Sequence, residues 1–326
     1  MAWDPSECVI HTEKLRKTYR TRRGKQVAVD SLDFQVPAGG VHGFLGPNGS
    51  GKTTTIRMLL GLSRPDSGTV HLYGEPVPKR LPAVIGRVGA IVENPKFQPN
   101  FSARKNLELL AAGIGADRKI VDQVLEDVGL RDRANDRFRG FSLGMKQRLA
   151  VAATMLKEPD LLIFDEPTNG LDPAGIREIR DTMRGLGEIG KTVLVSSHIL
   201  AEVEQVADTV SIIGRGRLLA SGTVSEIIGT KLSMTTHVGV ENRDLARRIL
   251  AQAGLNVRRD GDGLAVEGEP DGAKITKILA DAGHYVNELT PLKAGLESVF
   301  LELTAGEGPG GVGTDRTHRT EGGEEQ

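Results

Sequence analysis

The amino-acid sequence predicts an α/β fold built on a largely parallel sheet, followed by a smaller α+β domain. Three short apolar runs, at 41–45, 161–164 and 192–196, indicate buried strands, and each leads through a turn or polar cluster into a helical pattern. Strands that alternate with helices in this way form parallel sheets covered by helices. Hydrophobic residues make up 38% and charged residues 26% of the 326 residues, a composition that suits a globular protein of about two domains.

Composition also disfavours several classes of protein. No apolar run approaches the roughly 20 residues of a membrane-spanning helix, so we expect the chain not to cross a bilayer. The 42 basic and 43 acidic residues give a net charge of -1, which offers no global attraction for nucleic acid or acidic lipid. Cys8 is the single cysteine and cannot form an internal disulfide, and the first residues lack a signal-peptide pattern. We therefore expect a cytoplasmic protein.

The first chemical motif follows the apolar run at 41–45. Residues 46–53, Gly-Pro-Asn-Gly-Ser-Gly-Lys-Thr, match the phosphate-binding P-loop and open a helical segment. Glycines let successive backbone N–H groups surround a phosphate, and the helix N-terminus adds partial positive charge. Lys52 is expected to reach the β- and γ-phosphates of a nucleotide, and Thr53 to bind Mg²⁺. The alternative is a glycine-rich turn with an incidental lysine. The predicted nucleotide-binding residues are Gly46, Pro47, Asn48, Gly49, Ser50, Gly51, Lys52, Thr53 and Thr54.

The second motif is a pair of carboxylates, Asp165 and Glu166, directly after the apolar run at 161–164. A solvated strand end is the alternative interpretation. Together with the P-loop, the pair predicts that Asp165 is a second Mg²⁺ ligand and that Glu166 orients or deprotonates the attacking water.

The third motif, Phe-Ser-Leu-Gly-Met at 141–145, alone indicates a helix start with Ser142 as its N-cap. Combined with the P-loop and the two carboxylates, it resembles the signature Leu-Ser-Gly-Gly-Gln of the ATP-binding-cassette (ABC) ATPases. The resemblance implies a P-loop NTPase fold, with a RecA-like core and a helical subdomain at about 95–155. It also implies ATP hydrolysis by a head-to-tail homodimer around two MgATP, in which Ser142 and Gly144 contact the nucleotide held by the other copy.

Four further positions take roles from this resemblance. Tyr19 is similar to the aromatic residue that stacks on adenine, although a tyrosine packed locally in a strand is the alternative. Asp172 matches the D-loop that couples the two sites, and His198 matches the switch histidine that contacts the γ-phosphate and water. Glu93 stands where the family has a glutamine, and we expect it to act at the catalytic centre and on Mg²⁺. An ionised carboxylate accepts hydrogen bonds but cannot donate them as an amide does.

Glu93 and the run Ser-Leu-Gly-Met-Lys-Gln at 142–147 resemble the branch that serves bacitracin-type and lantibiotic-type exporters. The pattern at 296–304 resembles the closing helix of export-type subunits. The resemblance therefore implies that the chain is the ATPase subunit of a two-component exporter of drugs, antibiotics or peptides. A separate membrane permease would hold it at the inner face of the membrane. The alternative is a soluble ABC ATPase acting on ribosomes or nucleic acid. A single cassette, without a coiled-coil insertion or cysteine clusters, argues against that class, so no nucleic-acid partner is expected.

The predicted domain boundaries follow changes in sequence pattern. Residues 1–222 form the nucleotide-binding domain, 223–304 a small α+β domain and 305–326 a disordered tail rich in Gly, Glu and Thr. Within the small domain the pattern predicts, in order, a strand near 232–240, a helix near 242–253, a hairpin around 260–263, a helix near 271–282, a strand near 284–289 and a helix near 295–304. Its sequence predicts no ligand site.

Overall fold

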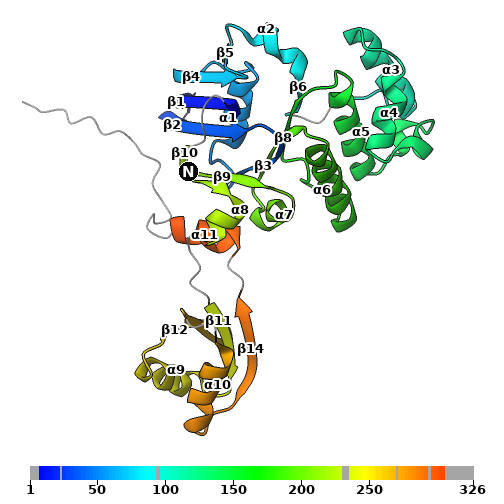
Figure 1. Cartoon of the computed structure of the whole chain (residues 1–326). Coiled ribbons are helices and arrows are strands. Elements are labelled where there is room, and N and C mark those ends of the chain that lie inside the picture. Colours follow the sequence, from blue (N-terminus) through cyan, green and yellow to red (C-terminus); the bar gives the residue numbers. More distant parts are fainter. Residues whose placement is uncertain are drawn as a thin grey trace, which may run out of the picture.

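The computed structural model describes residues 7–22, 24–92, 96–229, 235–268, 271–292 and 295–304, which are organised around three β-sheets (Figure 1). Two of the sheets belong to the main body, which we define as residues 7–229 together with the last helix. The third belongs to the α+β unit, residues 235–292. Among the described residues, no helix combines the length and the apolar character needed to cross a membrane.

The first sheet of the main body is antiparallel and has the strand order β2-β1-β4-β5. Its long β1–β2 hairpin places Tyr19 opposite Gln26 near the turn. The strands are β1 (Cys8–Thr21), β2 (Gly24–Pro37), β4 (Ser67–Leu72) and β5 (Glu75–Val77).

The second sheet has six strands in the order β10-β9-β3-β8-β7-β6. All its neighbouring pairs are parallel except β9 with β10. The three predicted apolar strands lie side by side as β3, β8 and β7, which confirms the predicted parallel sheet. The strands are β3 (Gly40–Leu45), β6 (Val88–Ile91), β7 (Leu161–Asp165), β8 (Thr192–Ser197), β9 (Thr209–Gly214) and β10 (Arg217–Thr223).

Helix α1 (Lys52–Leu59) lies between the two sheets, and other helices cover the far face of the parallel sheet (Figure 1). Alternate residues of β7 lie on opposite faces of the parallel sheet. Leu161 and Ile163 pack with α1, whereas Leu162 and Phe164 join the core under α5, α6 and α7. Burial on both faces explains why these strands appear in the sequence as continuous apolar runs. The covering helices are α5 (Leu143–Met155), α6 (Pro173–Glu188) and α7 (Leu200–Glu204).

A group of helices between β6 and β7 extends the main body at one side (Figure 1). Ser102 caps its first helix by accepting a hydrogen bond from the Lys105 backbone N–H at 3.1 Å. Besides α5, the group contains α3 (Ala103–Ile114), α4 (Ile120–Asp127) and the 3-10 turns Arg131–Arg133 and Phe138–Gly140. A short helix α2 (Leu81–Val84) and the turn Ile85–Arg87 precede β6.

The α+β unit has the order β-α-β-β-α-β and an antiparallel sheet with strand order β12-β13-β11-β14, the split βαβ arrangement. Its helices pack with alternate strand residues to form a separate core around Val238, Leu250, Leu264 and Leu279. The predicted strands, hairpin and helices are confirmed, with ends shifted by a few residues. The elements are β11 (Thr235–Val240), α9 (Arg243–Gln252), β12 (Asn256–Asp260), β13 (Gly263–Glu267), α10 (Gly272–Asp281) and β14 (Val286–Leu292).

The helices on either side of the α+β unit pack on the main body instead. Ile227 of α8 (Val224–Gly229) and Leu296 and Val299 of α11 (Leu296–Thr304) join its core beside α7. The backbone N–H of Leu296 donates to Glu204 Oε2 at 2.9 Å. The segment 223–304, predicted as one domain, is thus divided between two cores, because the apolar side of α11 finds its partners on α7 and α8. The predicted disordered tail lies outside the described residues.

Candidate active site

The P-loop joins the end of β3 at Leu45 to the start of α1 at Lys52. Gly51 has φ 108°, and a Cβ on it would lie 2.5 Å from the Ala28 carbonyl oxygen, so no larger residue fits. Neighbouring loops hold the P-loop from two sides. Gly46 N donates to Ser197 O at 3.3 Å, and Ser50 O accepts from Gly216 N at 2.9 Å. The loop is therefore preformed by backbone contacts.

A chain of charged contacts links the P-loop to the ends of β7 and β8. The Lys52 side chain is 5% exposed, and its Nζ lies 3.0 Å from Glu166 Oε1. The same ammonium donates to Gly46 O at 2.7 Å. His198 Nδ1 lies 2.7 Å from Glu166 Oε2. The structure thus brings together three predicted site residues from the carboxyl ends of adjacent parallel strands, where ligands of open α/β sheets bind.

Ser196, which no sequence motif marked, fixes the two carboxylates relative to each other. Its hydroxyl donates to Asp165 Oδ1 at 2.5 Å and accepts from Glu166 N at 3.0 Å. Asp165 and Ser196 are direct partners in the parallel pairing of β7 with β8. Glu166 has φ 51°, a left-handed conformation that is costly for a non-glycine residue, and the two-sided bonding at Ser196 helps to hold it.

Three oxygen-bearing side chains at this site suit a magnesium nucleotide. Thr53 lies in the first turn of α1, and the carboxylate of Asp165 has acceptor capacity beyond its bond to Ser196. The buried Ser50 hydroxyl has no hydrogen-bond partner among the described residues. No group of three or more His, Cys, Asp or Glu side chains forms a ready-made metal site in the described part of the chain. This donor set fits Mg²⁺, which keeps waters and substrate phosphates among its ligands.

A cavity of about 280 Å³ lies beside the P-loop and connects it to the β1–β2 hairpin. Tyr19, Gln26 and Ala28 of the hairpin line it, and so does Glu166. Tyr19 is 38% exposed, and Lys17 Nζ lies 5.6 Å from its ring centroid. The structure therefore places Tyr19 on the wall of the phosphate site, and it adds Gln26 and Ala28, which no sequence motif marked. The P-loop residues on the wall are Asn48, Gly49, Gly51, Lys52, Thr53 and Thr54.

Ser142, Gly144 and Asp172 do not line this cavity, but they lie at one helix–helix contact. Ser142 caps α5, accepting from Met145 N at 3.2 Å, and Asp172 caps α6, accepting from Gly175 N at 3.0 Å. A Cβ on Gly144 would approach Gly175 Cα to 3.4 Å, so glycine permits the close packing of α5 on α6. Both caps are exposed. Glu93 lies outside the described residues.

Comparison with known proteins gives concordant matches. The family model described as ABC transporter matches residues 29–169. The chain is 39% identical over 306 residues to the bacitracin transport ATP-binding protein of Bacillus licheniformis, covering 91% of this chain and 98% of that protein. It is 36% identical over 310 residues to the Nod factor export ATP-binding protein I of Paraburkholderia xenovorans, covering 92% and 98%. Among solved structures, cbiO1 from Clostridium perfringens, part of the ABC transporter complex cbiONQ, matches with a TM-score of 0.62 at 25% identity, covering 76% of this chain and 96% of that one.

Proposed function

This chain belongs to the ABC transporter family of ATPases, and on that premise we propose that it is the ATP-hydrolysing subunit of a two-component exporter. The P-loop NTPase fold predicted from the sequence is confirmed by its structural neighbours. The substrate class that we propose, drugs, antibiotics or peptides, is supported by the relative named as a bacitracin transport ATP-binding protein, and the direction of transport by the one named as a Nod factor export ATP-binding protein.

The contact chain of Lys52, Glu166 and His198 carries the proposal for hydrolysis. A bound triphosphate would offer Lys52 anionic oxygens in place of Gly46 O and Glu166, which releases the carboxylate to face water. Glu166 then orients the water and takes its proton as the oxygen attacks the γ-phosphorus and the bond to ADP breaks. His198 holds the Glu166 carboxylate on its other oxygen and lies near the departing phosphate.

We assign the Mg²⁺ ligands to Thr53 and Asp165, with Glu93 as a further candidate. The ion, when bound, neutralises charge on the β- and γ-phosphates. The Ser196 hydroxyl orients Asp165 for this role through its 2.5 Å hydrogen bond.

The second half of each site would come from another copy of the chain. Ser142 presents the N-terminus of the 13-residue helix α5, whose backbone N–H groups and partial positive charge suit a γ-phosphate. Because α5 packs on α6, the cap Asp172 moves with it. We propose that head-to-tail closure brings Ser142 and Gly144 onto the nucleotide of the opposite copy, with Asp172 between the two sites.

A separate permease would dock on the helical side of the main body and hold the chain at the inner face of the membrane. Four apolar side chains there are between 41% and 47% exposed, on α3 and just before it: Phe101, Leu109, Leu110 and Ile114. A neighbouring groove of about 260 Å³ is bordered by Leu110, Ile114 and Ala153. Apolar surface of this kind supports a protein contact.

The proposal is tested by expressing the chain with any polytopic membrane protein that the neighbouring reading frames of its genome encode. We expect the two to copurify, and we expect ATP-dependent export of a bacitracin-class peptide from cells, lost when Glu166→Gln replaces the parent. Ala substitution of Leu109 and Leu110 should weaken copurification, whereas Leu301→Ala, which changes an even more exposed leucine on α11, should not. A chain that binds no membrane protein, and whose deletion leaves the export of every tested compound unchanged, is not an exporter subunit.

A further inference from the structure

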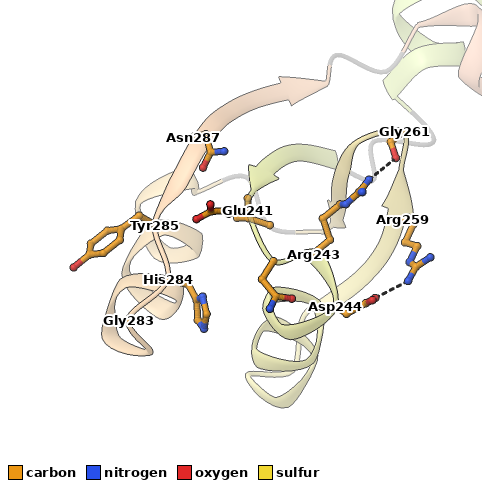
Figure 2. Close-up of a pocket in the computed structure, with 11 residues that line it drawn as sticks. Glu241, Arg243, Asp244, Arg259, Gly261, Gly283, His284, Tyr285 and Asn287 are labelled. Atoms are coloured by element: carbon orange, nitrogen blue, oxygen red, sulfur yellow. Dashed lines mark hydrogen bonds and ion pairs between the residues drawn. The ribbon is translucent and has the colours of Figure 1, made fainter.

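The α+β unit contains a cavity of about 850 Å³, about three times the volume of the cavity beside the P-loop. Three connections meet around it at one end of the four-stranded sheet: 240–244 between β11 and α9, 259–261 between β12 and β13, and 283–287 between α10 and β14 (Figure 2). This volume lies within the range of small-molecule sites. None of its lining residues belongs to the nucleotide site.

One side of the cavity is electropositive. The ten-residue helix α9 begins there at Arg243, and its N-terminus carries partial positive charge. Arg243 donates one N–H to Gly261 O at 3.2 Å, which holds the guanidinium at the rim while its other donors remain available (Figure 2). The Asn242 side-chain oxygen accepts from Leu245 N at 3.2 Å, so its amide N–H groups are left for a ligand.

The opposite side is electronegative. Helix α10, also of ten residues, ends beside the cavity, and the carbonyl groups of its last turn carry partial negative charge. The carboxylate of Glu241 points into the hollow, toward the wall that carries His284 and Asn287, whereas the Tyr285 ring points away (Figure 2). In the described part of the chain, Glu241 has no ion-pair partner. Asp244 and Arg259, which pair at 2.6 Å, neutralise each other and leave Glu241 and Arg243 as the unbalanced charges.

We propose that this cavity binds a small zwitterion of the free-amino-acid and short-peptide class. The ligand carboxylate lies at Arg243 and the N-terminus of α9, and its ammonium group lies at Glu241 and the end of α10. A purely anionic ligand would face Glu241, and a purely cationic one would face Arg243, so a ligand with both charges suits the cavity best. The volume of 850 Å³ accommodates several peptide residues as well as one amino acid.

Calorimetric titration of the full chain without nucleotide tests the proposal. The probes are the twenty L-amino acids singly, trialanine and pentaalanine, each at up to about 10 mM, and the best binder's N-acetylated and C-amidated forms. We expect at least one free zwitterion to bind, and each blocked form to bind about tenfold more weakly. The probe that binds most tightly shows whether the cavity prefers a single amino acid or a short peptide. If no probe binds, or if blocking either end leaves the affinity unchanged, the cavity is not a zwitterion site.

Two variants assign the two ends of the ligand. Arg243→Gln should remove the preference for the free over the amidated form, and Glu241→Gln should remove the preference for the free over the acetylated form. Arg247→Gln is the matched control, because Arg247 is exposed on the same helix but does not line the cavity. A variant that merely unfolded the α+β unit would lose the affinity for the free, the amidated and the acetylated probe equally. ATPase activity measured on the same samples should stay unchanged, which separates failure of this inference from failure of the proposed export function.

Discussion

Glu166 occupies the centre of the site, between the ammonium of Lys52 and the imidazole of His198. Glu166→Gln should slow ATP hydrolysis by about a hundredfold or more, because the amide cannot take the proton from water. Nucleotide binding should persist, and the ATP-bound dimer should accumulate. Single-turnover hydrolysis and light scattering with ATP measure the two effects. Turnover at the parent rate would exclude Glu166 as the base.

A substitution of Lys52 should have the opposite pattern to that of Glu166, because it should weaken ATP binding. Lys52→Ala removes the cation that lies against Gly46 O and Glu166, so the affinity for ATP should fall by about tenfold or more. Equilibrium binding of a fluorescent ATP analogue measures the loss. Lys105→Ala, an exposed lysine of α3, serves as the control and should bind like the parent.

His42 makes the stability of the chain depend on pH. It is 1% exposed, with its ring nitrogens 2.7 Å from Thr209 Oγ1 and 3.0 Å from Ser211 Oγ, and burial lowers its pKa to about 3. The unfolded chain, with a histidine pKa near 6.5, binds a proton more readily, so stability is full above pH 6.5 and falls as the pH drops toward 3.

Between pH 7 and pH 5 the His42 contribution should amount to about 2 kcal/mol of unfolding free energy. Urea unfolding at the two pH values measures it in the parent and in His42→Gln, whose amide keeps hydrogen-bonding groups toward Thr209 and Ser211. The variant should lose about 2 kcal/mol less than the parent. Equal losses would mean that His42 does not titrate with a lowered pKa.

Individual site residues could be predicted because each belongs to a short motif in the sequence. The residues that hydrogen-bond to them could not, because those contacts depend on the register of paired strands. Lys52 was predicted from the P-loop motif, Glu166 from the carboxylate pair after an apolar run, and His198 from the resemblance to the ABC ATPases. Ser196 carried no such signal, because its role arises from its position opposite Asp165 in the parallel pair. A signal was nevertheless present: Ser196 lies two residues before His198, at the end of a strand already predicted.

At the scale of elements, the β9–β10 turn joins the P-loop to the hairpin that carries Tyr19. Gly216 N donates to Ser50 O, and Gly216 O accepts from Asp30 N, each at 2.9 Å. The Asp30 carboxylate then binds Arg217 at 2.6 Å and Arg16 at 2.5 Å, and the hydrogen bonds from Arg217 lower its pKa. These bonds fix the position of the hairpin residues that line the nucleotide cavity relative to the P-loop.

Asp30→Ala should therefore raise the KM for ATP about fivefold while kcat stays within about twofold, since the catalytic groups of β7 and β8 are untouched. Steady-state kinetics measures both constants, and Asp30→Glu should restore part of the loss. Glu126→Ala, which removes the exposed ion pair between Glu126 of α4 and Arg131, is the control. A fall in kcat without a change in KM would place Asp30 elsewhere in the mechanism.

At the scale of the whole molecule, the sequence predicted the helix at 295–304 but not the surface on which it packs. An apolar stripe indicates that a helix is buried and does not tell which surface buries it. Leu296 and Val299 pack beside α7 and α8, and Glu204 caps the helix. The α+β unit is thus inserted between two helices of the main body, and its ends are adjacent because Thr235 pairs with Leu292.

Removal of α11 should destabilise the main body more than removal of the α+β unit does. Ending the chain at residue 229 uncovers the surface that Leu296 and Val299 bury, at about 1.5–3 kcal/mol for each side chain. Replacing residues 235–292 with a short Gly-Ser linker keeps α8 and α11 in place. Thermal unfolding with ATPase assays should show a lowered midpoint for the first variant and a parent-like midpoint for the second. Equal midpoints would contradict this role of α11.

Because α11 packs on the main body, it also determines when the main body can finish folding during synthesis. All the predicted nucleotide-site residues leave the ribosome before residue 229, so the P-loop and its strands can assemble early. The apolar surface on α7 and α8 then stays uncovered for about 4–15 seconds at ordinary elongation rates until α11 has been synthesised. The nascent chain is most exposed to chaperones and proteases in that interval, and a stalled ribosome would prolong it.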